Sequence, residues 1–124
     1  MCKILVIDDD PTGTELLITL LGLGGYQGCA VENWDDPLGE VVEKAPDLVI
    51  IDVRLSGRDG LVLLKQVRNH PIPAVASTPV LMMSGEDHRL QSRSAGANGF
   101  VEKPFDWDTM QRAIEKTMEG VLTN

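Results

Sequence analysis

The sequence predicts an α/β fold, in which a parallel five-stranded sheet is covered on both faces by five helices. Short apolar runs alternate with segments of helical periodicity along all 124 residues. The runs are almost wholly apolar instead of alternating, as is typical of strands that are buried on both faces. Each run is separated from the next by a segment long enough for a crossover helix, which parallel strands require.

The first strand is the apolar run of residues 3–7, which leads directly into three aspartates. A helix follows, because four leucines recur at helical spacing before the glycines of 22–25 end the pattern. These leucines are Leu16, Leu17, Leu20 and Leu21. A second and weaker strand is expected over residues 28–32.

The second helix begins after Asp36, since an aspartate can cap the helix and Pro37 suits its first position. Its apolar residues share one face, and Pro46 ends it. Residues 47–51 then form a third strand, which is again almost wholly apolar. The cap at its start and the proline at its end therefore define both bounds of this helix.

The third helix is expected to start at Asp59, as a cap, with Leu61, Leu64 and Val67 facing inward. The sequence HPIPAVAST predicts a loop, and residues 79–83 form the fourth strand. Proline is acceptable as the first residue of a strand. The chain therefore returns to the sheet through an irregular segment.

The fourth helix, within residues 86–96, has a weak apolar face, which predicts shallow packing. A short last strand covers residues 99–103. The final helix is capped by Asp106 and turns one apolar face inward, consisting of Trp107, Met110, Ile114 and Met118. At that spacing these large side chains indicate core packing.

Composition indicates a single domain over residues 1–124, because chains of about 100–150 residues usually form one. No apolar run is long enough to span a bilayer and no signal peptide is visible, so a cytoplasmic protein without membrane contact is expected. The formal charge of −8 argues against direct nucleic-acid binding. Cys2 and Cys29 lack metal-binding or redox spacing, which indicates buried free thiols.

Polar residues follow four of the five apolar runs directly. Asp8, Asp9 and Asp10 follow the first, and Asp52 follows the third. Ser84 and Lys103 come at the ends of the fourth and fifth strands. Because right-handed crossovers place the carboxyl ends of parallel strands on one edge, these groups are expected to converge where ligands bind in such folds.

Clustered carboxylates need a compensating cation, since two of them about 4 Å apart repel by roughly 4 kcal/mol at an effective dielectric of 20. Mg²⁺ suits two or three carboxylates and leaves coordination positions for water and phosphate. A lysine and a serine can bind phosphate oxygens, and an aspartate can itself attack phosphorus. The edge therefore has the groups that phosphoryl transfer to a carboxylate requires.

The motifs ILVIDDDP, DLVIIDVRLSGRDG, PVLMMSG and AGANGFVEKPF occur in an order and spacing that resemble the receiver domain of two-component response regulators. The resemblance covers the whole chain. It implies the doubly wound, flavodoxin-like strand order 2-1-3-4-5, as in CheY-like proteins.

By this resemblance, Asp52 is the phosphoacceptor, while Asp8 and Asp9 position Mg²⁺ together with Asp52 and the backbone carbonyl of Arg54. Asp10 has no role in the family pattern and is expected to be solvated or to cap the first helix.

Three further positions of the sequence match functional positions of the family. Ser84 and Lys103 match the family's hydroxyl residue and lysine, and the bond before Pro104 is usually cis in the family. Phe100 matches the aromatic switch position.

The implied function is phosphoryl acceptance on Asp52 from a sensor histidine kinase, a histidine phosphotransfer protein or a small acyl phosphate. The chain is then a phosphoacceptor that takes part in its own phosphorylation and dephosphorylation, and not an enzyme with a separate substrate. Phosphorylation is expected to reorganise the face formed by the fourth helix, fifth strand and fifth helix, which contacts a downstream protein.

The chain departs from the family at three positions. Ser56 replaces a frequent proline, Arg54 stands where methionine is common, and Glu86 lies two residues after Ser84. The two charged residues either tune the lifetime of the phosphoryl group and the choice of partner, or pair with each other on the surface.

Two other readings stay open. Asp8, Asp10 and Thr12 fit a DxDxT pattern that resembles haloacid dehalogenase phosphatases, in which the first aspartate is the nucleophile. Those proteins need a late acidic pair, and GFVEKPFDWD offers no convincing one. The other reading is a receiver-like interaction module that is never phosphorylated.

Overall fold

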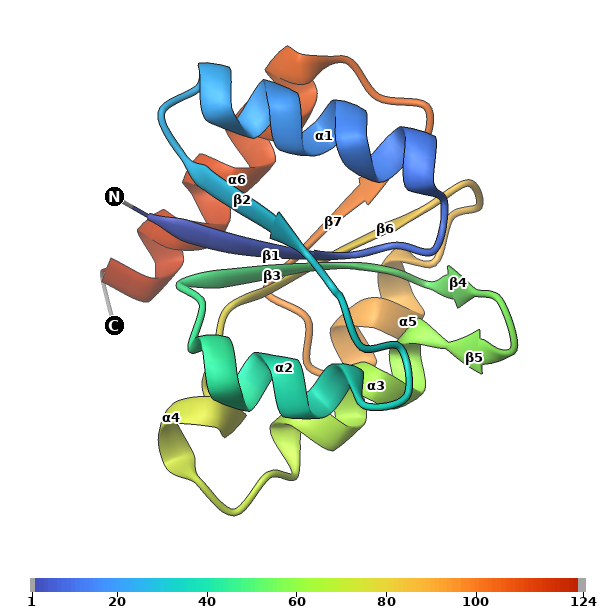
Figure 1. Cartoon of the computed structure of the whole chain (residues 1–124), viewed down its shortest axis with the longest axis vertical. Helices are drawn as coiled ribbons and strands as arrows, with labels where there is room; N and C mark the ends of the chain where they lie inside the picture. Colours follow the sequence, from blue (N-terminus) through green and yellow to red (C-terminus); the bar gives the residue numbers. More distant parts are fainter. Residues whose placement is uncertain (1, 123–124) are drawn as a thin grey trace.

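A computed structural model describes residues 2–122 of the chain and contains the predicted parallel sheet (Figure 1). The strands lie in the order β2-β1-β3-β6-β7. They are β1 (Lys3–Ile7), β2 (Gln27–Ala30), β3 (Leu48–Asp52), β6 (Val80–Ser84) and β7 (Gly99–Glu102). Counting these five alone, the predicted order 2-1-3-4-5 is confirmed, and every neighbouring pair is parallel.

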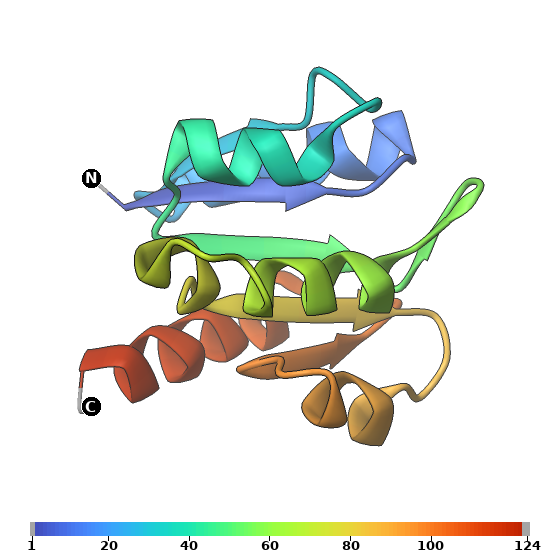
Figure 2. The ribbon, with the colours of Figure 1, turned by 90° about the horizontal axis from the view of Figure 1, so that it is seen from below.

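Helices cover both faces of the sheet (Figures 1 and 2). One face carries α1 (Pro11–Leu23) and α6 (Trp107–Leu122). The other face carries α2 (Pro37–Lys44), α3 (Gly60–Arg68), α4 (Pro73–Ala76) and α5 (Arg89–Ser94). The structure therefore has the three layers that the apolar strands predicted.

Alternate residues of each strand supply two apolar clusters, one on each face. In β1, Leu5 and Ile7 pack toward α2 and α3, whereas Ile4 and Val6 pack toward α1 and α6. The whole of β3 and β6 is buried, which explains why both strands are apolar up to their last residue. In α6 the predicted Met110 and Ile114 are fully buried.

Aspartate side chains cap the helices where the sequence predicts them. The Asp36 carboxylate accepts a hydrogen bond from the Gly39 N–H, and Asp59 accepts one from the Leu61 N–H. The Asp106 carboxylate accepts from the N–H of Thr109. Each cap satisfies a backbone donor that the first helical turn leaves unpaired.

Some details differ from the predictions. The predicted loop contains the short helix α4, because Pro73 suits a first helical position and Val75 is buried beneath it. The first helix continues through Gly22 to Leu23, and Leu16 is exposed on its outer face. The second strand begins one residue early, at Gln27.

A two-stranded ribbon, which the sequence did not predict, follows β3. It pairs β4 (Arg54–Leu55) with β5 (Arg58–Asp59) in antiparallel register. The backbone reverses at Gly57, whose φ of 70° is open to glycine without steric cost. The ribbon stands beyond the carboxyl end of the sheet (Figure 1).

The Arg68 side chain links the end of α3 to the segments that precede β6 and β7. Its guanidinium donates to the carbonyls of Ala76 (2.9 Å), Thr78 (2.7 Å) and Gly96 (2.8 Å), and to the Asn98 side chain (2.7 Å). Its half-buried position lowers the pKa of Arg68 from the usual value. One side chain therefore satisfies four acceptors in two separate segments, residues 76–78 and 96–98.

Within the described residues, no helix is both long and apolar enough to cross a membrane. Cys2 and Cys29 are free thiols, as predicted, but both are only partly buried.

Candidate functional site

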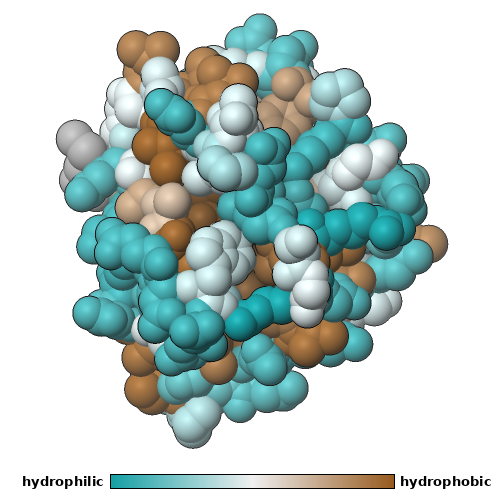
Figure 3. Space-filling model, turned by 45° about the vertical axis from the view of Figure 1, so that its right-hand side comes forward, coloured by the Kyte–Doolittle hydropathy of each residue, from teal (hydrophilic) through white to brown (hydrophobic). Residues whose placement is uncertain are grey.

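The carboxyl ends of four adjacent strands, β1, β3, β6 and β7, lie at the same edge of the sheet. Asp8 follows β1, Asp52 ends β3 and Ser84 ends β6, while Lys103 follows β7. The first three residues are buried. The surface turned toward this edge is largely hydrophilic, with apolar side chains in separate patches (Figure 3). The convergence that the topology predicts is therefore present.

The Lys103 ammonium lies between two carboxylates. Its Nζ donates to Asp8 Oδ2 at 3.1 Å and also to Asp52 Oδ2. Burial by itself lowers the pKa of Lys103, but the hydrogen bonds and charges of Asp52 and Asp8 outweigh burial and raise it. Lys103 is therefore the counter-ion of both carboxylates, and the peptide bond to Pro104 is cis, as the family pattern implied.

The backbone around Asp52 is packed tightly against the start of α3. An ideal Cβ on Gly60 would lie 2.0 Å from the Asp52 carbonyl oxygen, which leaves no room for a side chain. The Gly60 N–H donates to the Val53 carbonyl at 2.7 Å, and the Arg54 N–H donates to Asp52 Oδ1 at 2.9 Å. Sequence reasoning missed Gly60, because it had interpreted DG only as a helix start.

The other two aspartates have different surroundings. The Asp9 carboxylate is exposed and accepts the backbone N–H of Ser56 in the β4–β5 turn. Asp10 is also exposed and occupies the cap position of α1 without a side-chain capping bond, while its N–H donates to Asp8 Oδ1 at 3.0 Å. The expectation of a solvated residue at Asp10 is met.

Throughout the described part of the chain, no group of three His, Cys, Asp or Glu side chains is arranged to hold a metal ion. Asp8 and Asp52 both face Lys103, whereas Asp9 faces Ser56. The donors still fit Mg²⁺ in kind, because this ion prefers hard oxygen ligands and usually uses only one or two carboxylates. The predicted metal set of Asp8, Asp9, Asp52 and the Arg54 carbonyl stays a prediction.

The Ser84 hydroxyl is directed to a residue that sequence reasoning missed. Its Oγ lies 2.8 Å from His88 Nδ1 and accepts the Glu86 N–H at 3.2 Å. Ser84 is 1% exposed, so bulk water does not compete for this hydroxyl. The spacing of four residues was the only available sequence signal for the contact.

Arg54 and Glu86, two of the departures from the family, form a salt bridge. Arg54 Nη2 lies 2.8 Å from Glu86 Oε1, with both side chains mostly exposed. This observation fits the reading in which the two charges pair on the surface, and such exposed pairs contribute little stability. The other carboxylate oxygen of Glu86 is 3.9 Å from His88 Nε2.

The family model described as "Response regulator receiver domain" matches residues 4–115. The chain belongs to this family. The match includes all the predicted site residues, and it leaves the dehalogenase-like reading of Asp8 and Asp10 without support.

Curated proteins with a similar receiver sequence are longer than this chain. The transcriptional regulatory protein ZraR of Salmonella typhimurium is 35% identical over 117 residues, which are 93% of this chain and 26% of ZraR. The sensory transduction protein BceR of Halalkalibacterium halodurans is 31% identical over 124 residues, or 98% of this chain and 52% of BceR. The chain thus spans about a quarter and about half of these relatives.

Solved structures agree with the receiver fold. A response-regulator structure from Chloroflexus aurantiacus has a TM-score of 0.86 and 30% identity, and covers 95% of this chain and 98% of its own. The chemotaxis response regulator CheY4 of Vibrio cholerae has a TM-score of 0.84 at 24% identity, with coverages of 94% and 98%. The CheY4 comparison supports the fold alone.

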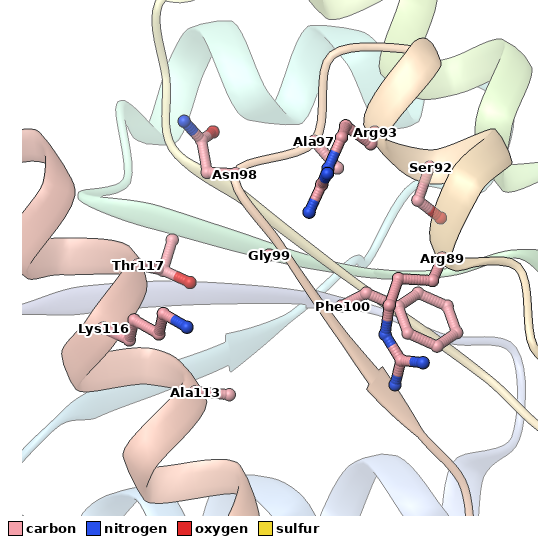
Figure 4. Close-up of a pocket in the computed structure, with 10 residues that line it drawn as sticks. All are labelled: Arg89, Ser92, Arg93, Ala97, Asn98, Gly99, Phe100, Ala113, Lys116 and Thr117. Carbon is pink, nitrogen blue, oxygen red and sulfur yellow. The ribbon is translucent and has the colours of Figure 1, made fainter.

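In this receiver, Phe100 lies on β7 at the wall of a surface pocket of about 270 Å³ between α5 and α6 (Figure 4). The Arg89 guanidinium stacks over the Phe100 ring at 5.3 Å from its centroid. Arg93 and Lys116 flank the same pocket from α5 and α6 (Figure 4). The predicted switch residue is partly buried, and neither Asp8 nor Asp52 is among the residues that line this pocket.

Proposed function

We propose that this receiver accepts a phosphoryl group on Asp52 and that phosphorylation changes the surface formed by α5, β7 and α6. The observation that carries the proposal is the placement of the buried Asp52 carboxylate against Lys103, with Asp8 on the same ammonium. A buried carboxylate that is paired with a cation is a suitable nucleophile toward phosphorus.

In the proposed reaction, an Asp52 carboxylate oxygen forms a bond to phosphorus. With a phosphohistidine donor the P–N bond breaks, and the imidazole leaves with the electron pair and takes up a proton. With acetyl phosphate the P–O bond breaks and acetate leaves. The Lys103 ammonium supports either route by neutralising charge on the phosphoryl oxygens.

Mg²⁺ is the proposed cofactor, held by Asp8, Asp9, Asp52 and the Arg54 carbonyl. When bound, it would offset the negative charge that accumulates between the carboxylates and the phosphoryl group. Lys103 already compensates part of this charge, since it contacts both Asp8 and Asp52. The chain acts in this proposal as a phosphoacceptor, and the phosphoryl donor is a sensor histidine kinase or a histidine phosphotransfer protein.

The output surface is proposed to contact a downstream protein with an acidic segment. The pocket beside Phe100 is lined by Arg89, Arg93 and Lys116, a concentration of positive charge in a chain of net charge −8. Arg89 Nη1 already lies 3.6 Å from Asp87 Oδ1, so the carboxylates of an acidic partner would pair mainly with Arg93 and Lys116. The short α5 has one buried residue, Ser92, which suits a surface that rearranges.

Intact-mass measurement after incubation with Mg²⁺ and acetyl phosphate tests the proposal. The parent should gain one phosphoryl group, and Asp52→Asn should abolish the gain. Asp10→Asn is the matched control, because Asp10 is an exposed neighbouring aspartate with no proposed role.

Labelling that survives in Asp52→Asn but is lost in Asp8→Asn would support the phosphatase-like reading instead. If the parent gains no mass, binding of beryllofluoride with Mg²⁺ separates the two remaining cases. Binding would indicate a short-lived aspartyl phosphate, and its absence would indicate an interaction module that is not phosphorylated.

A further inference from the structure

We propose that His88 is a positioning residue that holds the Ser84 hydroxyl away from the phosphoacceptor, so that it opposes the switched state of the receiver. This inference rests on the proposed phosphorylation of Asp52. The observation behind it is the 2.8 Å contact between Ser84 Oγ and His88 Nδ1, together with the near-complete burial of Ser84.

A serine hydroxyl has a single proton to donate. A phosphoryl oxygen on Asp52 can only accept a hydrogen bond, so Ser84 must donate that proton to it in order to bind it. Ser84 already accepts the Glu86 N–H at 3.2 Å, which leaves its proton for one further partner. If His88 Nδ1 takes the proton, the phosphoryl oxygen cannot have it.

Glu86 favours the tautomer in which His88 Nδ1 is the acceptor. The Glu86 carboxylate lies 3.9 Å from the opposite ring nitrogen, Nε2. A nearby negative charge favours a proton on that nitrogen, and a neutral imidazole then has an unprotonated Nδ1. Arg54 orients the same carboxylate through its 2.8 Å salt bridge to the other oxygen.

These contacts form a continuous series from the loop after the phosphoacceptor to the hydroxyl residue. The Arg54 N–H donates to Asp52, the Arg54 side chain pairs with Glu86, and Glu86 faces His88. Because His88 is mostly buried, with its side chain 17% exposed, its contact with Ser84 is better protected from water than the exposed Arg54–Glu86 pair. His88 is therefore the member of the series with the largest expected effect.

The affinity of the receiver for beryllofluoride in the presence of Mg²⁺ is the measurement that tests this role, because this phosphoryl mimic should bind the switched state. His88→Leu removes the acceptor, so the affinity should rise about two- to tenfold, as expected for losing one competing hydrogen bond. His88→Asn retains an acceptor near the position of Nδ1 and should restore an affinity close to that of the parent.

Two controls separate the proposed role from a general effect on folding. In a Ser84→Ala background, His88→Leu should leave the affinity unchanged, because the hydroxyl that it releases is missing. The other histidine, His70, lies in a remote loop where its Nδ1 accepts the Ile72 N–H, and His70→Leu should have no effect.

Equal or weaker binding by His88→Leu would overturn the role of His88 while leaving phosphorylation of Asp52 intact. Tightening that persists in Ser84→Ala would also overturn it, because His88 would then act through another group. A parent that does not bind beryllofluoride would refute the phosphoacceptor function and this inference together. Imidazole ¹⁵N spectra provide an independent check, since a proton found on Nδ1 of neutral His88 contradicts the proposed competition.

Discussion

Replacing Gly60 with alanine should damage both the fold and the site, because the new methyl group has no space. An ideal Cβ at this position lies 2.0 Å from the Asp52 carbonyl oxygen and 2.9 Å from its carbonyl carbon. Both neighbours are backbone atoms, so no side-chain rotation relieves the contact. The start of α3 and the end of β3 would have to separate, and this segment of β3 carries the proposed phosphoacceptor.

Overpacking of a buried position costs about 1–3 kcal/mol, and the lower chain entropy of alanine in the unfolded state offsets about 0.4–1 kcal/mol of it. We therefore expect Gly60→Ala to lower the free energy of unfolding by about 1–2 kcal/mol. Affinity for beryllofluoride should fall as well, since Asp52 is displaced.

Gly22→Ala is the matched control. Gly22 lies inside α1, has no positive φ, and has no heavy atom within 4 Å of an added Cβ. The same chemical change should therefore stabilise the protein by about 0.5–1 kcal/mol and leave beryllofluoride binding unchanged. Urea denaturation measures both variants, and a Gly60→Ala protein as stable as Gly22→Ala would refute the steric argument.

Three other substitutions test separate contacts. Lys103→Met leaves Asp8 and Asp52 without their shared cation and should lower the free energy of unfolding by about 1–3 kcal/mol at pH 7, which urea denaturation measures. This value is reduced from that of fully buried pairs because Lys103 is partly exposed. Glu40 is buried, which by itself raises its pKa, but hydrogen bonds from Lys44 and two backbone N–H groups lower the pKa overall. The Glu40 carboxylate should thus stabilise the fold above its ordinary pKa of about 4.3, and this stabilisation should be lost as the pH falls through the lower folded-state pKa. Urea denaturation at a series of pH values should therefore show that Glu40→Gln is less stable than the parent near neutral pH and equally stable in acid. Arg68→Met removes four hydrogen bonds and should lower the free energy of unfolding by about 2–4 kcal/mol, as measured by thermal or urea unfolding. The control variant Arg58→Met changes an exposed arginine and should be as stable as the parent.

The sequence predicted the sheet well because its central strands have no solvent-facing side. Residues 47–51 and 79–83 are almost wholly apolar, and the observed strands Leu48–Asp52 and Val80–Ser84 are each shifted from them by one residue. The helix starts could also be predicted, because they depend on contacts between residues that are close in sequence. The Asp106 cap, for example, accepts a hydrogen bond from a backbone N–H only three residues away. The strand order came from the family resemblance, as periodicity alone does not determine which strands are neighbours.

Side-chain directions at the site could not be predicted, because they depend on contacts between distant segments. The role of Asp9 as a magnesium ligand stays a prediction, whereas the hydrogen bond that its carboxylate accepts from the Ser56 N–H was not predicted, because it needs the unpredicted β4–β5 turn. The role of Gly60 likewise depends on how closely α3 approaches β3. His88 has no motif that would identify it, and only the observed orientation of the Ser84 hydroxyl reveals the contact.

The arrangement of Lys103 and Ser84 implies that the two proposed phosphoryl-binding groups do not move independently. The Lys103 N–H donates to the Ser84 carbonyl at 2.7 Å, so the ends of β6 and β7 are joined next to the site. A phosphoryl group on Asp52 would add a charge of about −1.5 to −2 there and attract the Lys103 ammonium. That ammonium also balances Asp8, whose carboxylate would then depend more on another cation. Phosphorylation should therefore strengthen the need for Mg²⁺ at Asp8 at the same time as it draws the joined ends of β6 and β7 toward Asp52.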